Sequence, residues 1–414
     1  MSPRADFTFA TKTLVAKRAG YRCSFPDCDR STIGPGAGAE ETASTGVGAH
    51  IFSASAGGPR GPGGLTDEEL VRPENCIWLC GNHARLVDTN RGAKYPPALL
   101  LSFKALHEAR IARDMQGLPF PFGWFHEVRV PLSPIFSPHV TVQLGKLNLL
   151  VGNNGSGKSA LCEWIGGFSQ LELLDRWRNR RQNTSPVEIS LKLFQPDEVE
   201  LGLTIDGMGD VSFTENGAPV PINVNPARIV YPRARGLTNT NGLDDRQLLA
   251  HLLRVDECQV GSICQAAHSY EHSTVKNYRF AADEENKCRL SVDVSGTHPG
   301  LSFRMLSGTE QEMVFIELVT ALARAHARHA PTLLVLDAAV TEFFDGWFEF
   351  YANHLNDANS LFQTIVVIPT CNLDTDRLAW LGWEIIRTTG KYPEISIEQS
   401  IRRNSEAVGT SVGG

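Results

Sequence analysis

The hydrophobic pattern of the first hundred or so residues is helical only at its two ends. Residues 8–21 predict a short helix, and residues 97–113 predict an amphipathic helix with a proline at its start. Between them, residues 34–64 are rich in Gly and Pro, which indicates loops and short strands. Thr66 and Glu69 have the spacing of a capping box, so a short helix should begin there. We expect a loop-rich N-terminal region that ends in a long helix.

From residue 140 onward, short apolar runs alternate with helical segments. Residues 140–152 predict two strands that lead into a helix from Lys158, and residues 187–230 alternate apolar and polar positions as a small β subdomain does. Residues 243–285 indicate mostly polar helix. A long helix after Ser307 is followed by further elements, namely an apolar strand at 332–337, a helix near 342–356 and a second apolar strand at 364–368. Buried strands alternating with helices predict an α/β fold with a parallel sheet covered on both faces.

The run LPFPFGWF at 118–125 interrupts both patterns and indicates a linker or a docking strand. We expect a linker or docking segment at 118–138, between a first domain at 1–117 and a second at 139–414. The sequence shows no internal repeat.

Composition narrows the class of protein. The chain has 414 residues, of which 42% are hydrophobic and 21% charged, so it should fold into a globular core rather than stay disordered. The net charge is −7, but the first 115 residues carry +2 and the remainder −9, so a nucleic-acid function fits the first part better. Without an apolar run of membrane-spanning length or a signal-peptide core, we expect a cytoplasmic protein with no membrane association.

Four of the nine cysteines lie in the first 80 residues, and without an export signal they indicate thiols or metal ligands rather than disulfides. Cys23 and Cys28 form one closely spaced pair, and Cys80 and His83 form another. Two pairs of soft ligands on tight turns predict a structural, tetrahedral zinc site. The alternative is two unrelated thiols and a surface histidine. Cys76 falls outside the set and should serve packing.

A glycine-rich motif follows the strand predicted to end near residue 152. It fits G-x-x-x-x-G-K-[ST] between a strand and a helix, which predicts a phosphate-binding loop. Its backbone N–H groups should surround phosphates, Lys158 should reach the β- and γ-phosphates, and Ser159 should bind Mg²⁺. The residues expected to bind nucleotide here are Asn153, Asn154, Gly155, Ser156, Gly157, Lys158 and Ser159.

Two later segments carry a family resemblance. Leu306-Ser-Gly-Thr-Glu-Gln311 opens the long helix, and the strand at 332–337 ends in Asp337. With the phosphate loop, this order resembles the ABC-type ATPase heads of the SMC, Rad50 and bacterial defence group, over about residues 125–395. The resemblance implies an ATP-binding domain with a β subdomain and a helical insertion, in which Ser307 contacts the nucleotide of a second subunit and Asp337 holds Mg²⁺ through water. Ser307 is equally suited to be a helix N-cap, and both roles are compatible.

The chain departs from that family at positions that matter for hydrolysis. Ala338 stands where the family has the Glu that polarises water, Pro369 or Thr370 stands where it has a His, and Thr309 replaces a Gly of the signature. We therefore expect weak or absent ATP hydrolysis; Glu342 either substitutes or is a solvated helix residue. The family's glutamine at the edge of the β subdomain has three candidates that the sequence leaves open, Gln170, Gln182 and Gln195. The basic run at 176–181 indicates an exposed helix face or, alternatively, a nucleic-acid or partner contact.

A second resemblance lies between the two metal-ligand pairs. The chain reads Gly48-Ala-His-Ile51, then GGPR at 57–60, and then Asn75-Cys-Ile-Trp-Leu-Cys80-Gly-Asn-His83-Ala-Arg-Leu-Val-Asp88. With later matches through Tyr95, Leu100, Lys104 and Glu108, this is similar to the HNH endonuclease module found on effectors of bacterial antiphage systems. That module is a ββα unit around one divalent ion.

The HNH resemblance implies a role for three residues. His50 would be the general base toward water, because a neutral imidazole can accept its proton. Asn75 would pin the loop between strand and helix, and Asp88 would bind a catalytic Mg²⁺ or Mn²⁺. Many relatives have a metal-binding His at the Ala84 position and often an Asp at Ala49. The sequence here therefore offers few ligands for the catalytic metal. The alternative for Asp88 is an ion pair with Arg91 or Arg85.

Together these resemblances imply a metal-dependent DNA endonuclease effector in antiphage or anti-plasmid defence. ATP binding and pairing of its ABC-type heads into a homo-oligomer would regulate it, and a second defence subunit is a candidate partner. The alternative is a nucleotide-sensing assembly protein whose zinc module docks DNA or a partner without cutting.

Overall fold

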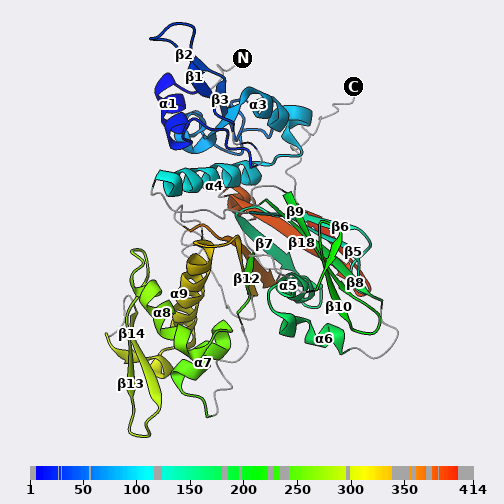
Figure 1. Ribbon diagram of the computed structural model, residues 1–414, viewed down its shortest axis with the longest axis vertical. Helices are drawn as coiled ribbons and strands as arrows, with labels where there is room; N and C mark the ends of the chain where they lie inside the picture. Colours follow the sequence, from blue (N-terminus) through cyan, green and yellow to red (C-terminus); the bar gives the residue numbers. More distant parts are fainter. Residues whose placement is uncertain are drawn as a thin grey trace, which may run out of the picture.

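The computed structural model describes residues 6–399 except 27, 29, 56, 116–123, 180–184, 195–197, 222–226, 233–241, 295–298, 338–354, 356–359, 370–374 and 381. Figure 1 shows an N-terminal module (residues 6–115) stacked on a larger α/β head (residues 124–399). Several positions singled out in the sequence lie outside the described residues: Gln182, Gln195, Ala338, Glu342, Thr370 and, apart from Leu355, the helix expected near 342–356.

The N-terminal module is built around an antiparallel pair of strands, in which Gly46 faces Cys80 and His50 faces Cys76. Thr8 caps the first helix, and the predicted capping box of Thr66 and Glu69 is confirmed. Two small apolar clusters hold the module together, one around Ile77 and Leu100 and one around Trp78. Its elements are α1 (Phe9–Arg18), β1 (Ile33–Pro35), β2 (Thr42–Ser44), β3 (Gly46–His50), α2 (Asp67–Leu70), η1 (Pro73–Asn75), β4 (Cys76–Cys80), α3 (Gly81–Asp88), η2 (Thr89–Gly92) and α4 (Pro97–Met115).

The head's central sheet has the strand order β12-β16-β17-β7-β18-β19, and every neighbouring pair except β18–β19 is parallel. Along β16, Leu334 and Leu336 join one apolar cluster while Leu333 and Val335 join the other. Successive side chains of a strand point to opposite faces, so this sheet is covered on both, and the predicted α/β fold is confirmed. Its elements are β7 (Leu147–Gly152), α5 (Lys158–Gly166), β12 (Arg228–Val230), α9 (Gly308–Ala327), β16 (Thr332–Asp337), β17 (Gln363–Pro369), α11 (Thr375–Trp380), β18 (Trp383–Lys391) and β19 (Glu394–Gln399).

A second six-stranded sheet, β11-β10-β9-β8-β5-β6, forms the expected β subdomain. It differs from the prediction at 118–138, because Trp124–Leu132 is a nine-residue strand paired on both sides rather than a linker. The Pro and Gly residues just before it hid its start. The subdomain and the segment before it comprise β5 (Trp124–Leu132), β6 (Val140–Gln143), η3 (Leu171–Leu174), α6 (Asp175–Arg178), β8 (Val187–Phe194), β9 (Glu198–Ile205), β10 (Val211–Glu215) and β11 (Ala218–Val220).

The insertion before the long helix α9 is less helical than predicted. It begins with two helices, the second of which ends at His268, and the next segment forms a hairpin instead of continuing as helix. The alternation of exposed and half-buried residues along this hairpin is a strand period that the helical reading of 243–285 overlooked. The elements are α7 (Asp245–Leu253), α8 (Glu257–His268), β13 (Val275–Ala282), β14 (Cys288–Val294), β15 (Leu301–Ser302) and η4 (Phe303–Met305).

The N-terminal module packs against the starts of the head's parallel strands. Helix α4 contacts β18 and α11, and the Ser102 hydroxyl accepts a 2.8 Å hydrogen bond from the backbone N–H of Lys146, just before β7. Within the head, at the start of β17, the Gln363 side chain accepts from the N–H of Phe125 in β5 and donates to the Phe125 carbonyl. The glycine-rich loop follows the other end of β7, so the module and the loop lie at opposite ends of the parallel strands. None of the described helices has the length and apolar character needed to cross a bilayer.

Candidate nucleotide and metal sites

The glycine-rich loop runs from the end of the fully buried strand β7 into α5, as predicted. Gly155 and Gly157 have φ angles of +80° and +79°, which other residues adopt at a cost, so glycine sets the path of the loop. Asn153, Asn154 and Gly155 are exposed, and Ser159 is half-buried. The N–H groups at the start of α5 are suited to an anion.

Lys158 is buried at the centre of the loop. Its ammonium donates hydrogen bonds to the carbonyls of Gly152 at 2.6 Å and Asn153 at 2.8 Å. Burial lowers the pKa of Lys158, and the nearby Asp337 carboxylate opposes that shift. The lysine and the strand-terminal aspartate therefore lie at the same edge of the sheet, as the motif order implied.

Two residues that the sequence did not single out complete this edge. Thr388 of β18 faces Gly152 in register, and its hydroxyl lies 2.5 Å from that of the buried Ser156. A Cβ on Gly152 would approach the Thr388 Oγ1 to 1.9 Å, so the close contact requires glycine there. Tyr231 donates a 3.1 Å hydrogen bond from its hydroxyl to Asp337, and burial raises the pKa of this tyrosine. Both residues are far from the loop in the sequence, so no sequence motif includes them, and only the fold brings them to the loop.

Ser307 caps the 20-residue helix α9 through a capping box with Glu310. Ser307, Gly308 and Thr309 are exposed, so this helix start is accessible to another molecule. Behind it, Arg304 binds the fully buried Asp245 at 2.6 Å and fixes the preceding turn. The N-cap interpretation of Ser307 is confirmed, and a contact to a second subunit's nucleotide stays a prediction.

Gln170 and the basic run lie close to α5. The backbone N–H of Gln170 donates to the Gly166 carbonyl, and its buried side-chain Oε1 has no hydrogen-bond partner among the described residues. In the basic run, Arg176 pairs with Glu163 at 2.5 Å and lies over the ring of Trp177. These contacts favour the exposed-face interpretation for Arg176.

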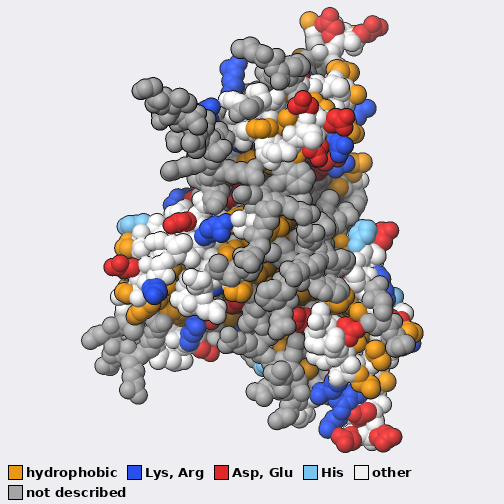
Figure 2. Space-filling model, turned by 180° about the vertical axis from the view of Figure 1, so that it is seen from behind, with side chains coloured by type: hydrophobic (Ala, Val, Ile, Leu, Met, Phe, Trp, Pro, Cys, Tyr) orange, Lys and Arg blue, Asp and Glu red, His pale blue; other side chains and the backbone are white. Residues whose placement is uncertain are grey.

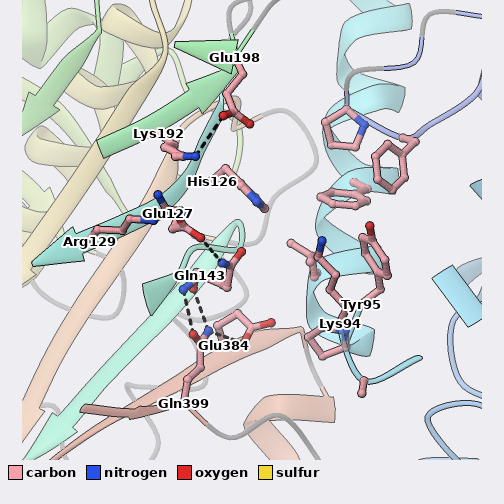
Figure 3. A pocket seen from close by; sticks show the side chains of 16 residues that line it. Lys94, Tyr95, His126, Glu127, Arg129, Gln143, Lys192, Glu198, Glu384 and Gln399 are labelled. Atoms are coloured by element: carbon pink, nitrogen blue, oxygen red, sulfur yellow. Dashed lines mark hydrogen bonds and ion pairs between the residues drawn. The ribbon is translucent and has the colours of Figure 1, made fainter. Parts of the chain in front are cut away.

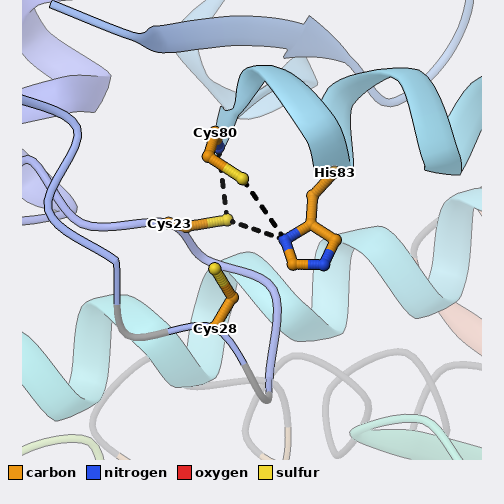
Figure 4. A group of neighbouring side chains, drawn as sticks. All are labelled: Cys23, Cys28, Cys80 and His83. Carbon is orange, nitrogen blue, oxygen red and sulfur yellow. Dashed lines mark hydrogen bonds between the residues drawn. The ribbon is translucent and has the colours of Figure 1, made fainter.

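In the N-terminal module, Cys23, Cys28, Cys80 and His83 come together with their ligand atoms all within 4.8 Å of one another (Figure 4). The Nδ1 atom of His83 lies 3.5 Å from the sulfur of Cys23 and 3.4 Å from that of Cys80. Ligand atoms around a tetrahedral zinc are separated by about 3.8 Å, given Zn–S bonds near 2.3 Å. The predicted set is therefore spaced as a metal site requires.

The surroundings of the four ligands suit a soft cation. Burial raises the pKa of Cys23 and of Cys28, so these thiols would hold their protons unless a cation replaced them. At Cys80 burial also acts to raise the pKa, but hydrogen bonds to the thiolate, with the backbone N–H of His83 foremost, outweigh it and lower the value. The ring of Phe25 stacks on His83 at 4.0 Å and fixes its orientation.

His50 is the last residue of β3, which pairs with β4, and β4 leads directly into α3. Its ring is half-buried and stacks on Phe7, with ring centroids 3.8 Å apart. The buried Asn75 accepts from the Phe52 N–H at 2.7 Å and donates to the carbonyls of Phe52 and Leu70. Asn75 thus holds the loop that follows His50, the positioning role that the resemblance implied.

Asp88 forms an ion pair, but with neither of the arginines considered from the sequence. Arg60 of the GGPR segment is 6% exposed and donates to Asp88 at 2.6 Å. The same guanidinium donates to the carbonyls of His50, Ile51 and Val87. Arg60 therefore ties the backbone at the end of β3 to the end of α3 and to the Asp88 carboxylate. Among the described residues, the Cys23 cluster is the only group of three or more His, Cys, Asp or Glu with metal-ligand spacing.

No protein-family model and no curated protein matches the chain. Its fold is similar to that of an SMC head bound to the C-winged helix domain of ScpA, with TM-score 0.47 and 14% identity, covering 67% of this chain and 97% of that one. The SMC head domain from Thermotoga maritima has TM-score 0.40 and 14% identity over 66% of this chain and 98% of that one. The recombination mediator RecF has TM-score 0.43 and 11% identity over 68% and 99%. The case for nucleotide binding comes from the loop's own residues.

Proposed function

We propose that this chain is a metal-dependent DNA endonuclease carried on an ABC-type, ATP-binding head. Support for the head comes from the loop between β7 and α5, with Lys158 buried at its centre and Asp337 at the same edge of the sheet. In this arrangement the loop N–H groups and Lys158 hold the phosphates of ATP, and Ser159 and Asp337 hold its Mg²⁺. Because Ala338 offers no base at the position after Asp337, we expect slow turnover.

The nuclease half of the proposal rests on His50. This half-buried imidazole ends a strand of a β3–β4–α3 unit, and Asn75 and Arg60 fix the loop and the helix end around it. A neutral imidazole held in this way can take the proton of a water that attacks phosphorus. Asp88 is the candidate ligand for Mg²⁺ or Mn²⁺, which would stabilise charge on the phosphate. The four-residue cluster at Cys23 holds structural zinc.

The positions of the phosphate loop and of His50 determine how ATP could regulate the nuclease module. The N-terminal module packs at the starts of the parallel strands, and the phosphate loop lies at their ends, so bound ATP does not touch His50. ATP therefore acts through the pairing of two heads, each exposing its Ser307 helix start to the nucleotide of the other. Paired heads would bring two nuclease modules together, which suits cutting of both strands of a duplex.

One observation favours the alternative, in which the N-terminal module docks DNA or a partner without cutting. The Asp88 carboxylate is committed to Arg60, and Ala84 and Ala49 supply no metal ligand beside it. This is the arrangement of a structural ion pair as much as that of a metal site.

A plasmid-nicking assay with Mg²⁺ or Mn²⁺ separates the two functions. We expect native protein and the His329→Ala control, an exposed histidine of the head, to nick DNA equally. His50→Ala should lose nicking by about 100-fold or more, the size expected for loss of a general base. Equal nicking by His50→Ala, or none by native protein with either metal, would favour the docking function.

A further inference from the structure

A cavity of about 460 Å³ lies between the N-terminal module and the head, away from the phosphate loop. One wall comes from the N-terminal module at Phe25, Tyr95 and Phe103, and the other from strands β5, β6, β8, β9, β18 and β19. Figure 3 shows Tyr95 and Lys94 facing Glu384 and His126 across it. The volume is in the range of small-molecule sites.

The wall from the N-terminal module is aromatic. The ring of Phe25 makes edge contacts with Tyr95 at 5.7 Å and with Phe103 at 5.4 Å between centroids. The same Phe25 stacks on His83 of the metal cluster, and this contact holds the Phe25 ring in place. Rings held in place offer a flat ligand a stacking surface without loss of their own freedom.

The wall from the head consists of carboxyl and carboxamide groups in fixed orientations. Gln143 donates to Glu127 at 2.6 Å, and Gln399 donates to Glu384 at 3.0 Å and to the Gln143 carbonyl at 2.8 Å. Glu384 is only 4% exposed, yet among the described residues Gln399 alone donates to its carboxyl, through Oε2. Its second oxygen is left to a ligand in the cavity.

The charges that line the cavity nearly cancel. Arg129 pairs with Glu127, and Lys192 pairs with Glu198 at 3.2 Å, which leaves Lys94 on one wall and Glu384 on the other. Burial raises the pKa of Glu384 to about 7 and lowers the pKa of His126, so near neutral pH this carboxyl can donate or accept and the imidazole is uncharged. Such a site favours an uncharged, polar, planar ligand over an ion.

We infer that this cavity binds a nucleobase, stacked on the aromatic wall and hydrogen-bonded at its edge by Glu384. Base edges present neighbouring donors and acceptors, which carboxyl and carboxamide groups recognise. The base belongs either to a free nucleoside or to a nucleic-acid strand. Because both walls contribute, the bound base fastens the N-terminal module to the head. This inference does not depend on the proposed nuclease activity.

The test uses the full-length chain carrying Lys158→Ala, which disables the phosphate loop. Adenosine, guanosine, cytidine and thymidine have no phosphate for that loop, and a mixed-sequence single-stranded oligonucleotide supplies bases within a strand. Binding of each is measured by calorimetry in three further backgrounds. Glu384→Gln alters the carboxyl that would hydrogen-bond the edge of the base. Ala93→Trp places a bulky side chain in the cavity from an exposed lining position. Glu398→Gln, at an exposed carboxylate of β19, is the control.

We expect at least one probe to bind, and Glu384→Gln and Ala93→Trp each to weaken it by about tenfold or more. Glu398→Gln should bind as the parent does. Binding by nucleosides identifies the free source, and binding by the oligonucleotide alone identifies the strand. The inference is overturned if no probe binds, or if both cavity variants bind with the parent's affinity. Because Ala93 is exposed, Ala93→Trp keeps the test valid even if Glu384→Gln does not fold.

Discussion

The metal cluster and the phosphate loop gather their side chains in different ways. The loop takes its residues from one stretch between β7 and α5, set on a sheet that large apolar clusters bury on both faces. The cluster takes its ligands from the segment after α1, the end of β4 and the start of α3. Around the cluster, the described residues of the N-terminal module form two apolar clusters, both smaller than those of the head.

The difference indicates where each part gets its stability. The head should fold without nucleotide, because its core exists regardless of the loop. The N-terminal module should depend on its metal, because bringing buried thiols together without a cation is unfavourable. Substitutions at the metal cluster should therefore unfold the N-terminal module, whereas substitutions at the loop should reduce ATP binding and leave the fold intact.

The largest expected effect is at the metal cluster. Cys80→Ser should reduce zinc from about one ion per chain to less than half, and the N-terminal module should unfold while the head stays folded. Elemental analysis and limited proteolysis measure the two results. Cys258→Ser, an exposed cysteine of α8, is the matched control and should keep its zinc. A Cys80→Ser chain that resists protease as native protein does would show that the module needs no metal.

At the loop, binding should be lost but not the fold. Lys158→Ala removes the ammonium that reaches the phosphates, and we expect ATP affinity to fall by about 100-fold, or about 2.7 kcal/mol. Zinc content and melting temperature should stay those of native protein. Titration with a fluorescent ATP analogue measures the change, with the exposed Lys391→Ala as control. Affinity within about threefold of native protein would exclude the loop as the ATP site.

A third effect, which depends on pH, concerns Glu384, where the N-terminal module meets the head. Burial raises its pKa from an ordinary 4.5 to about 7, so the unfolded chain releases this proton at lower pH than the folded chain does. Stability from this group is therefore greatest below pH 4.5, falls as the pH rises to about 7, and is constant above that.

Glu384→Gln should remove this dependence. Relative to the variant, native protein should lose up to about 1.4 kcal/mol of unfolding free energy per pH unit over that interval. Denaturant titrations from about pH 5 to about pH 8 measure the difference, and the exposed Glu398→Gln should follow native protein. Parallel curves for native protein and Glu384→Gln would mean that the carboxyl is not buried in solution.

The sequence predicted those features that depend on local spacing. The glycine-rich loop, the capping box of Thr66 and Glu69 and the parallel sheet are confirmed because each follows from residues close together in the chain. The four metal ligands, though far apart, were found because soft ligands in close pairs are rare. Strand β5 was missed because Pro and Gly residues precede it.

Residues that act through tertiary contacts could not be read from the sequence. Arg60 reaches the His50 carbonyl and the Asp88 carboxylate across segments separated in the chain, and the sequence offered Arg85 and Arg91 instead because they are near Asp88 in the chain. Thr388 meets Ser156 through the register of β18 with β7. Such pairings depend on which strands lie side by side.

The central claim is that ATP acts on the distant N-terminal module by pairing heads, and the mass of the chain in solution tests it most directly. Light scattering should show a larger dimer or higher-oligomer fraction when ATP and Mg²⁺ are added to native protein and to Ser262→Arg, an exposed position of α8. Ser307→Arg should stay at its ATP-free mass, because a bulky cation would occupy the place of the partner's phosphate. Loss of the Ser307 cap costs about 1 kcal/mol, which the long helix should tolerate. Identical masses for native protein and Ser307→Arg, each with and without ATP and Mg²⁺, would contradict the claim.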